Sequence, residues 1–477
     1  MEKDMRIYTN MAAIRAAVYL DKADKKSSDS IARLSSGYKI NTSEDNPVGR
    51  AISNKLKMQI NSLERSIQNA SDGVSIVQTA EGALGEIHAM LERMTELAVQ
   101  GSTDTYTDYD RTAIQNEIDQ ILDEIDRIAQ DTDFNERPIL DGTLSRKAYA
   151  EGINTIEQLY IDESVTEGRY GFSVTSEPEK AEYSSAGFAS NVVPAGAGGS
   201  ISLNGVTIYI NEGDSIDDVY AKLKEGSYTA DVQMLSPSGK AAVGEPITFT
   251  QMYYGSHKSI SIDCSTKGLA DFLGMDKTVD ERGKDTEVTI IPTDTGFTKT
   301  AKVTSQGEYV TFTDKSDFEM TLRIDAGTFT EKQENGECRV AYNVTSVGAM
   351  TIQLGANEGQ LIDIDIPKVS TETLRLDALN FKTSEGCSDA ITKIGDAIAQ
   401  ISEIRSLIGA YQNRMEASIA SLNVTNENMT SSLSTIADVN MAAEMTAYTT
   451  QNVLSQAATS MLAQANQAPE KVLQLLQ

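Results

Sequence analysis

The sequence is poor in the residues on which thick globular cores and catalytic sites depend. It contains no tryptophan, and aromatic residues make up only 6% of its 477 residues. A thick core normally relies on aromatic side chains, so this composition favours thin helical layers. There are only two histidines, His88 and His257. Acid–base catalysis needs titratable groups at a fixed spacing, and the histidines offer none.

Motifs that carry chemistry are also missing. The His-Glu-x-x-His pattern of zinc peptidases is absent, as are a P-loop and a Gly-x-Gly-x-x-Gly run after a strand. The glycine-rich run at 196–199 lacks the helix and the lysine that a phosphate-binding loop requires. Acidic pairs such as Asp217 and Asp218 are typical of solubilising positions on a solvent face. We therefore predict no catalytic, cofactor-binding or metal-binding residue, and a protein that is not an enzyme.

Cysteine is scarce as well. The three cysteines, Cys264, Cys338 and Cys387, follow no pairing pattern. An odd and sparse set of this kind forms neither a disulfide framework nor a zinc site. The simplest interpretation is three small buried or half-buried side chains.

Long apolar runs are missing too. No stretch approaches the roughly 18 apolar residues that cross a membrane. The first ten residues lack the apolar segment of a secretory signal peptide. We expect no membrane insertion and, if the protein leaves the cell, a route without a cleaved signal.

Negative charge dominates the composition. The chain carries 70 acidic and 41 basic residues, a formal net charge of −29. Such a charge argues against nucleic acids and anionic membranes as partners. It favours a soluble surface that repels copies of itself until specific contacts form.

Long helical patterns are present at both ends of the chain. Apolar residues recur with 3-4 spacing from Leu56 to Ala98, and again from Ile391 to Leu422. A stripe of this period is the seam of a helix that packs along another helix. The spacing predicts a helix at about 48–99, a second helix with Thr107 as its N-cap, and a C-terminal helix from about Ser388.

Three glycines interrupt the first long helix. Gly73, Gly82 and Gly85 each weaken it by roughly 1 kcal/mol relative to alanine. We predict that neighbouring helices approach this helix closely at these positions.

The middle of the chain follows a different pattern. Alternating runs bounded by turn residues predict strands, and Asp217–Leu223 predicts a short helix between them. The run at 192–200, which is rich in glycine and alanine, is interpreted as a flexible joint. The predicted strands are 201–203, 206–210, 247–250, 260–262, 288–291 and 309–312.

These patterns predict a mainly α fold with a β-rich insert. Both termini form a coiled-coil-like helical stem, followed by a β-hairpin region and a central inserted α+β part. The terminal arms have too few large apolar residues to be stable alone, so we expect them to be disordered in the monomer. The predicted domains are the arms, 1–45 with 425–477; the stem and hairpin region, 46–175 with 371–424; and the solvent-facing insert, 176–370.

Several runs of sequence resemble bacterial flagellin, the subunit of the flagellar filament. The resemblance covers roughly 1–175 and 371–477, and it is specific because it is long, two-ended and in the right order. Within the insert, residues 203–208 and 216–223 resemble the small β-α repeat of flagellins and hook-associated proteins, near 200–274. The matching terminal runs are Ile31–Asn41, Ser71–Leu84, Glu92–Gln100, Asn116–Asp119, Leu407–Arg414, Met461–Gln467 and Val472–Leu476.

The resemblance implies a structural subunit that polymerises into the flagellar filament for swimming motility. It implies export through the flagellar type III apparatus to the extracellular flagellum, with an export chaperone on the C-terminal arm. Its implied partners are further copies of the chain, hook-associated and cap proteins, and vertebrate Toll-like receptor 5. The residues expected to act in assembly are Ile7, Met11, Ile14, Leu34, Ile40, Met461, Leu462, Val472, Leu473 and Leu476.

The resemblance also implies a receptor site on the first long helix and its neighbour. The matching positions are Arg93 as a fork of donors, Leu97 as an apolar anchor and Glu117 as an acceptor. The alternative is that Arg93 and Glu117 are ordinary solvated charges and that Leu97 partly fills the stem.

Two other functions remain open from the sequence. The chain could be a hook–filament junction protein from the same machinery, or an adhesin whose working part is the β-rich insert. The complete terminal motifs favour the filament subunit. Long filaments would support that interpretation, a capped assembly the junction protein, and glycan or mucin binding by the insert the adhesin.

Overall fold

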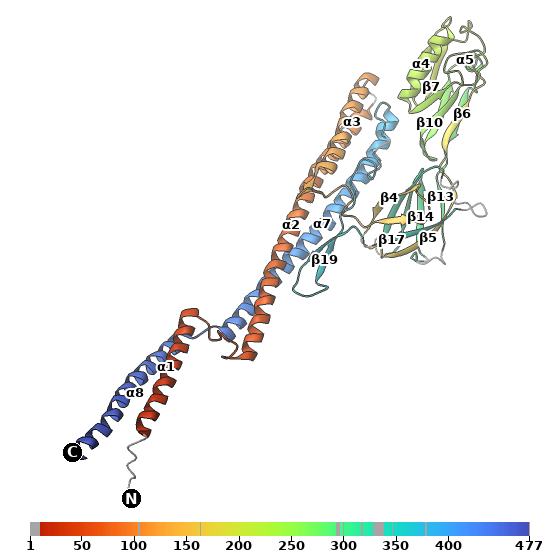
Figure 1. The fold of residues 1–477 in the computed structure, drawn as a ribbon. Helices are drawn as coiled ribbons and strands as arrows, with labels where there is room; N and C mark the ends of the chain where they lie inside the picture. Colours follow the sequence, from red (N-terminus) through yellow and green to blue (C-terminus); the bar gives the residue numbers. More distant parts are fainter. Residues whose placement is uncertain are drawn as a thin grey trace. The chain divides into compact units, whose positions relative to one another are not determined.

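The computed structural model describes residues 10–103, 105–162, 164–291, 296–298, 300–315, 318–327, 338–345, 347–376 and 379–476. The chain forms two compact units, which are described in turn. The first comprises Met1–Ser71, Gln353–Leu361 and Glu416–Gln477, and the second Asp72–Ile352 and Ile362–Met415. Helices at both ends and a β-rich middle confirm the predicted fold class (Figure 1).

The described helices include two that exceed fifty residues. They are α1 (Met11–Ser36), α2 (Pro47–Gly101), α3 (Asp108–Asp131), α4 (Ile216–Thr229), α5 (Lys267–Leu273), α7 (Ser384–Ala437) and α8 (Met441–Leu476).

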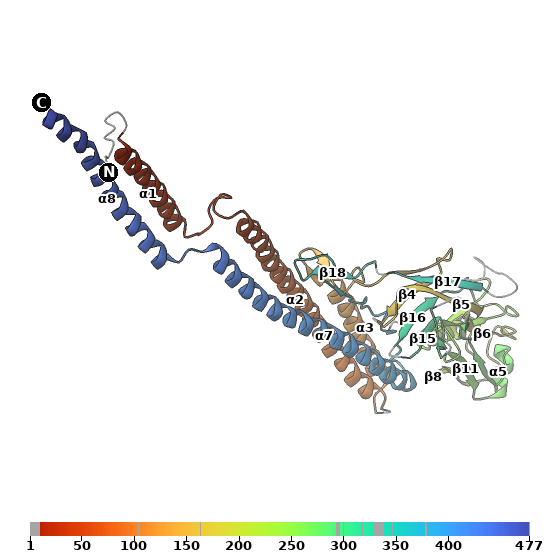
Figure 2. The ribbon, with the colours of Figure 1, turned by 90° about the horizontal axis from the view of Figure 1, so that it is seen from below.

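The first unit contains the paired terminal arms α1 and α8, which lie side by side (Figures 1 and 2). Asn10 Nδ2 donates to the carbonyl oxygen of Ala465 at 2.7 Å, and the amide of Val439 donates to the carbonyl of Gly37 at 3.0 Å. Residue numbers therefore rise along one helix as they fall along the other, so the pair is antiparallel. Whether the arms are ordered in the monomer stays a prediction.

Local signals set the ends of the arms and of the stem helices. Gly37 ends α1 with φ +74°, a left-handed conformation that glycine adopts without strain. Pro47 occupies the first position of α2, where its missing N–H costs nothing, and Asn46 Oδ1 accepts from the amide of Gly49. Thr107 and Asp110 form a capping box at the start of α3, which confirms the predicted N-cap.

In the second unit α3 and the parts of α2 and α7 that belong to this unit form the stem, and their apolar stripes are buried against one another. Polar contacts also join the helices, because Arg405 of α7 pairs with Glu81 of α2 at 2.8 Å. The predicted stripes are therefore confirmed as the seams of this helical layer. The fully buried seam residues include Val77, Leu84, Ile87, Leu91, Met94, Ile118, Ile125, Ile394, Ile401 and Ile408.

Only one of the three stem glycines is a close-approach point. A Cβ at Gly73 would lie 2.3 Å from Ile352 Cδ1 and 2.8 Å from Met415 Sδ. The prediction is confirmed there. It is wrong for Gly82 and Gly85, where nothing lies within 4 Å of such a Cβ.

In the described part of the chain, the strands make four larger sheets and two small hairpins. The hairpins are β1 (Asp133–Phe134) with β2 (Arg137–Pro138), and β18 (Met350–Gln353) with β19 (Leu361–Ile364). The remaining strands are β3 (Ala148–Ala150), β4 (Ile156–Ile161), β5 (Gly168–Ser176), β6 (Lys180–Ser184), β7 (Gly199–Leu203), β8 (Val206–Ile210), β9 (Val232–Leu235), β10 (Thr248–Tyr254), β11 (Ser259–Cys264), β12 (Thr278–Arg282), β13 (Glu287–Ile290), β14 (Lys302–Gln306), β15 (Tyr309–Thr313), β16 (Glu319–Ile324) and β17 (Cys338–Val344).

The proximal β-domain consists of residues 148–176 and 287–344. Its two antiparallel sheets have the orders β13-β5-β17-β3 and β14-β15-β16-β4, and their inner faces share one apolar core. Phe172 of β5 and Phe312 of β15 meet in this core with ring centroids 5.0 Å apart. The arrangement is a β-sandwich.

The distal β-domain, residues 180–282, is nested inside the proximal one. Helices α4 and α5 and the sheets β6-β10-β9 and β12-β11-β7-β8 enclose a separate core. The strands and the short helix predicted for this region are confirmed, with α4 longer than expected. This domain therefore has the apolar interior that independent folding requires.

Two predictions for the insert are corrected by the structure. The boundary placed at 176 is wrong, because β4 and β5 pair with β16 and β17 and so belong to the proximal β-domain. The run at 192–200 is no flexible joint, because Val193 and Ala197 are buried in the distal core. Glycine content suggested flexibility, but the flanking apolar side chains anchor the segment.

Candidate assembly and receptor surfaces

The paired arms expose many large apolar side chains. Met11, Ile14, Val18 and Tyr19 of α1 are all exposed, and Met461 of α8 is 63% exposed. Two helices that pack only against each other cannot bury apolar residues on their outer faces. Exposed apolar stripes of this extent are typical of surfaces that another protein chain covers.

The structure places most of the predicted assembly residues on these arms. Leu34, Ile40 and Leu462 are half-buried, whereas Met11, Ile14 and Met461 face outwards. Ile7 lies outside the described residues. The remaining three lie in α8, but their side chains fall outside the described part: Val472, Leu473 and Leu476.

A polar turn joins α1 and α2, as the polar run before Pro47 predicts, but the contacts of its carboxylate were not predicted from the sequence. Asp45 accepts from the amides of Asn41 and Thr42 at 3.1 and 2.9 Å and pairs with Arg33 of α1 at 3.0 Å. The hydrogen bond from the Thr42 amide and then that from Arg33 lower the pKa of Asp45 to about 2. Arg33 also lies 3.9 Å from Glu444 of α8. Arg33 thus links the turn to both arms, α1 and α8. The short polar run 42–46 is the part of the sequence that indicates the turn.

The predicted receptor residues do not form one exposed patch. Arg93 Nη2 and Nε lie 2.9 and 3.2 Å from Glu117 Oε1, and Nη1 lies 3.0 Å from Glu96. Arg93 and Glu117 are each about half exposed, and the hydrogen bonds that Arg93 donates to Glu117 are the main cause of its raised pKa.

Leu97 corrects the prediction of an exposed apolar anchor. It is only 2% exposed, because it lies three residues after Met94 on the buried stripe of α2. The alternative, in which Leu97 fills the stem, holds for this residue.

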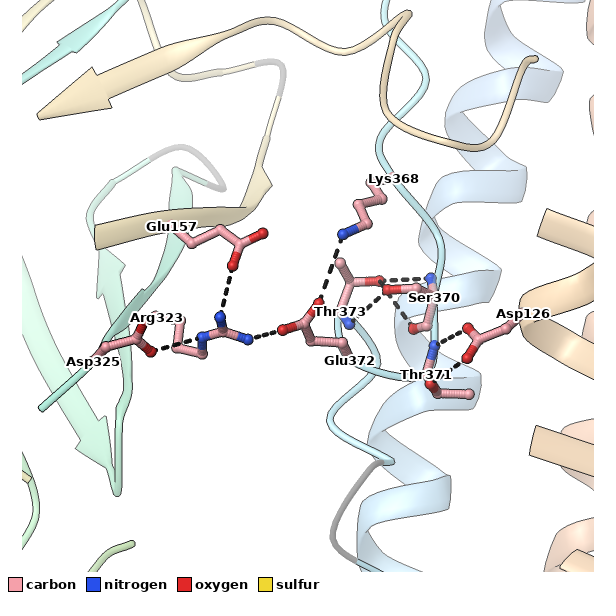
Figure 3. Close-up of polar contacts among 9 residues, drawn as sticks. All are labelled: Asp126, Glu157, Arg323, Asp325, Lys368, Ser370, Thr371, Glu372 and Thr373. Carbon is pink, nitrogen blue, oxygen red and sulfur yellow. Dashed lines mark hydrogen bonds and ion pairs between the residues drawn. The ribbon is translucent and has the colours of Figure 1, made fainter. Parts of the chain in front are cut away.

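A strap of residues 366–376 connects the proximal β-domain with the stem, and Figure 3 shows its polar contacts. Arg323 of β16 pairs with Glu157 at 2.8 Å, with Asp325 at 3.0 Å and with Glu372 of the strap. Lys368 lies 3.6 Å from Glu372 on the other side. The guanidinium of Arg323 thus forms ion pairs with three carboxylates, which come from β4, from the end of β16 and from the strap.

The strap is also bound to the stem. Asp126 of α3 accepts from the amide of Thr371 at 2.8 Å and from its hydroxyl at 2.7 Å (Figure 3). Ser370 and Thr373 close a turn around this contact. Sequence reasoning missed this joint because its members come from distant parts of the chain.

No group of three or more His, Cys, Asp or Glu side chains in the described part of the chain could hold a metal ion. No described helix is long and apolar enough to cross a membrane.

Two family models match the helical ends. The bacterial flagellin N-terminal helical region matches residues 7–145, and the C-terminal helical region matches residues 391–476. These matches cover the arms and the stem, which carried the resemblance seen in the sequence.

Curated relatives match nearly the whole chain. A flagellin of Clostridium tyrobutyricum is 32% identical over 97% of this chain and 99% of its own length. Flagellin D of Vibrio cholerae is 30% identical over 99% of both chains. A flagellin of Salmonella typhimurium is 30% identical over 98% of this chain and 99% of its own.

These findings confirm the resemblance and the prediction of a structural protein that is not an enzyme. Flagellins are components of the extracellular flagellar filament. With the helical ends, the nested insert and full-length relatives in agreement, the chain belongs to the bacterial flagellin family.

Proposed function

We propose that the arm surface drives polymerisation of this filament subunit in an open, head-to-tail manner. The observation that carries the proposal is the exposed apolar stripe on the antiparallel arms. A heterologous contact that does not close on itself generates a helical filament, which buries such stripes between copies. Motility follows from the filament as a whole.

Charged substitutions on the arms test the assembly proposal. Ile14→Asp and Val18→Asp change exposed positions, so the monomer should keep its fold while filament formation is lost. Tyr209→Asp is the matched control, because Tyr209 is 70% exposed on β8 of the distal β-domain. Electron microscopy of concentrated protein gives the readout. Filaments of normal length from either arm variant would contradict the proposal.

Removing a whole arm is a stronger version of the same test. Deletion of residues 1–35 or 430–477 should leave a soluble, folded monomer that does not polymerise. A capped, non-propagating assembly of the intact chain would instead favour the junction protein. The full-length matches to flagellins support the filament subunit.

Export is proposed from the family resemblance and from the same exposed surface. An apolar stripe on α8 needs covering before secretion, and a flagellar export chaperone is the expected partner. A chain truncated after Ala437 should lose chaperone binding while Tyr209→Asp keeps it. Equal chaperone binding by the truncated chain would rule out this arm as the site.

Recognition by Toll-like receptor 5 is proposed through Arg93 and Glu117, without Leu97 as an anchor. The pair is half exposed on α2 and α3. The receptor would therefore meet the guanidinium of Arg93 in an orientation that its ion pair with Glu117 holds. Arg93→Ala should weaken monomer binding by roughly 1–2 kcal/mol.

Arg127→Ala is the matched control for Arg93→Ala. Arg127 is an exposed, ion-paired arginine on α3 that contacts Glu124 and Asp131. Filaments should not bind the receptor if assembly covers the pair. An unchanged affinity of Arg93→Ala monomer in a direct binding assay would refute this site.

A further inference from the structure

A cleft of about 780 Å³ lies within the second unit. One side is formed by β15, β16 and the strap, and the other by a polar face of α7. Residues 252–258 of the distal β-domain line its end. Neither the arm surface nor the Arg93–Glu117 pair contributes to it.

Arg375 is a strained residue at this cleft. Its φ of 58° is left-handed, which is costly for a side chain of this size. Nη2 donates to Thr311 Oγ1 at 2.8 Å, and Cζ lies 5.4 Å from the centre of the Tyr309 ring. Among the described residues, no hydrogen bond engages Nε or Nη1. The guanidinium is therefore held in place while its Nε and Nη1 hydrogens remain able to bond a ligand.

Glu319 shares the same side of the cleft. Burial raises the pKa of Glu319, which Arg375 counteracts, and burial lowers the pKa of Arg375, which Glu319 counteracts. Within the described residues no direct ion pair joins the two. Partly desolvated charges that no direct ion pair neutralises gain stability from a further polar group that bonds them.

Tyrosine rings supply the apolar part of the lining. Tyr309 lies beside Arg375, and Tyr253 lies beside Lys258, whose ammonium is 5.4 Å from the ring centre. Tyr254 lines the same end. Such rings present a flat apolar face and a polar edge.

The facing wall is one side of α7. Its lining residues recur every three or four positions, so they project from one face of the helix. Each has a planar or charged end that can bond hydroxyl groups. They are Asp389, Lys393, Asp396, Gln400 and Glu403.

The charge balance selects the class of ligand. Five acidic and three basic side chains line the cleft, which disfavours phosphates, sulfates and uronic acids. The many polar ends disfavour lipids. Carboxylates and a guanidinium fork pair well with neighbouring hydroxyls, and the apolar C–H faces of sugar rings stack on tyrosine. We propose that this cleft binds a neutral oligosaccharide.

Saturation-transfer NMR on the full-length monomer tests the proposal. The probes are lactose, maltotriose and chitotriose at about 10 mM, where a site of millimolar affinity is mostly occupied. At least one should receive saturation, whereas trigalacturonate should receive less. The measurement does not depend on filament formation, so its outcome is separate from that of the assembly tests.

Two variants remove polar contacts at positions where the backbone accepts the new residue. Asp396→Ala changes an exposed position of α7, and Arg375→Gly keeps a backbone that glycine adopts without strain. Each should weaken sugar binding about tenfold, the usual effect of losing a charged hydrogen bond. Tyr309→Ala should weaken it too, while Tyr209→Ala, outside the cleft, should not.

Three results would overturn the proposal. The first is no transfer from any of the neutral sugars at about 10 mM, so that affinity is weaker than millimolar. The second is unchanged binding in both Asp396→Ala and Arg375→Gly. The third is stronger binding of trigalacturonate, which would assign the cleft to anions.

Discussion

Glu179 and Lys284 are joined by two reciprocal backbone hydrogen bonds at the neck of the distal β-domain. The amide of Glu179 donates to the carbonyl of Lys284 at 3.0 Å, and the reverse bond measures 2.9 Å. An ion pair of 2.7 Å joins their side chains. The chain therefore enters and leaves the domain at one place, although the whole domain lies between the two residues.

Excision of residues 180–283 follows from this neck. Joining Glu179 to Lys284 through a short glycine linker should leave the proximal β-sandwich and the helices folded, because each β-domain has its own core. The shortened chain should still form filaments. Circular dichroism and electron microscopy check both points, and a helical but non-polymerising product would contradict the expectation.

The sequence alone predicts that the larger region between about residues 180 and 370 is dispensable for polymerisation. A chain that joins about residue 180 to about residue 370 would keep β5 but lose its partner strand β17, so the proximal β-sandwich would be disrupted. We therefore expect the excision at the neck to be better tolerated than that deletion. Thermal unfolding of the two products compares them directly.

Substitution of alanine for Gly82 and for Gly73 should change the free energy of unfolding in opposite directions. Gly82→Ala meets open space and should stabilise α2 by roughly 0.5–1 kcal/mol. Gly73→Ala must displace Ile352 and Met415, an overpacking that costs about 1–3 kcal/mol before the helical gain. Chemical denaturation measures the difference. Equal stability of the two variants would refute the close approach at Gly73.

The turn at Asp45 should be sensitive to acid. Hydrogen bonds lower the pKa of Asp45 to about 2 from its ordinary value of 3.8, so its contribution to stability is present above that ordinary value and is lost as the pH falls towards about 2. Asp45→Asn should therefore lower the melting temperature near neutral pH and have little effect near about pH 2. Asp29→Asn, at an exposed position of α1, is the control. A pH-independent difference would contradict the assignment.

Loss of Arg323 should loosen the strap. In Arg323→Ala the carboxylates of Glu157, Asp325 and Glu372 lose their shared cation and repel one another. The amide of Thr371 donates a hydrogen bond to Asp126. Hydrogen exchange of this amide should then speed up about tenfold, equivalent to ~1.4 kcal/mol. Arg282→Ala, at an exposed arginine of β12, should leave this rate unchanged. An unaltered rate in Arg323→Ala would show that Asp126 alone holds the strap.

The arms should be cleaved before the stem in the monomer. Their outer faces are apolar but uncovered, whereas α2 and α3 carry buried seams over residues 77–125. Local opening is easiest where few apolar contacts are lost. Limited proteolysis followed by mass spectrometry should show both ends trimmed first. Equal protection of the arms and the stem would argue against mobile arms.

The sequence by itself determined the long helices, the N-cap at Thr107, the apolar seams, helix α4 and four strands of the distal β-domain, β7, β8, β10 and β11. These features depend on neighbours within a few residues, as at Thr107 with Asp110 or Gly37 after α1. Only the tertiary structure decided which strands share a sheet, so the pairing of β5 with β17 moved a domain boundary. The tertiary structure also buries Leu97 in the stem and Val193 in the distal core. It places Arg323 against Glu372, and Arg375 close enough to Glu319 for each to shift the other's pKa. Those relations join segments far apart in the chain, where side-chain packing and charge pairing, rather than local spacing, set the outcome.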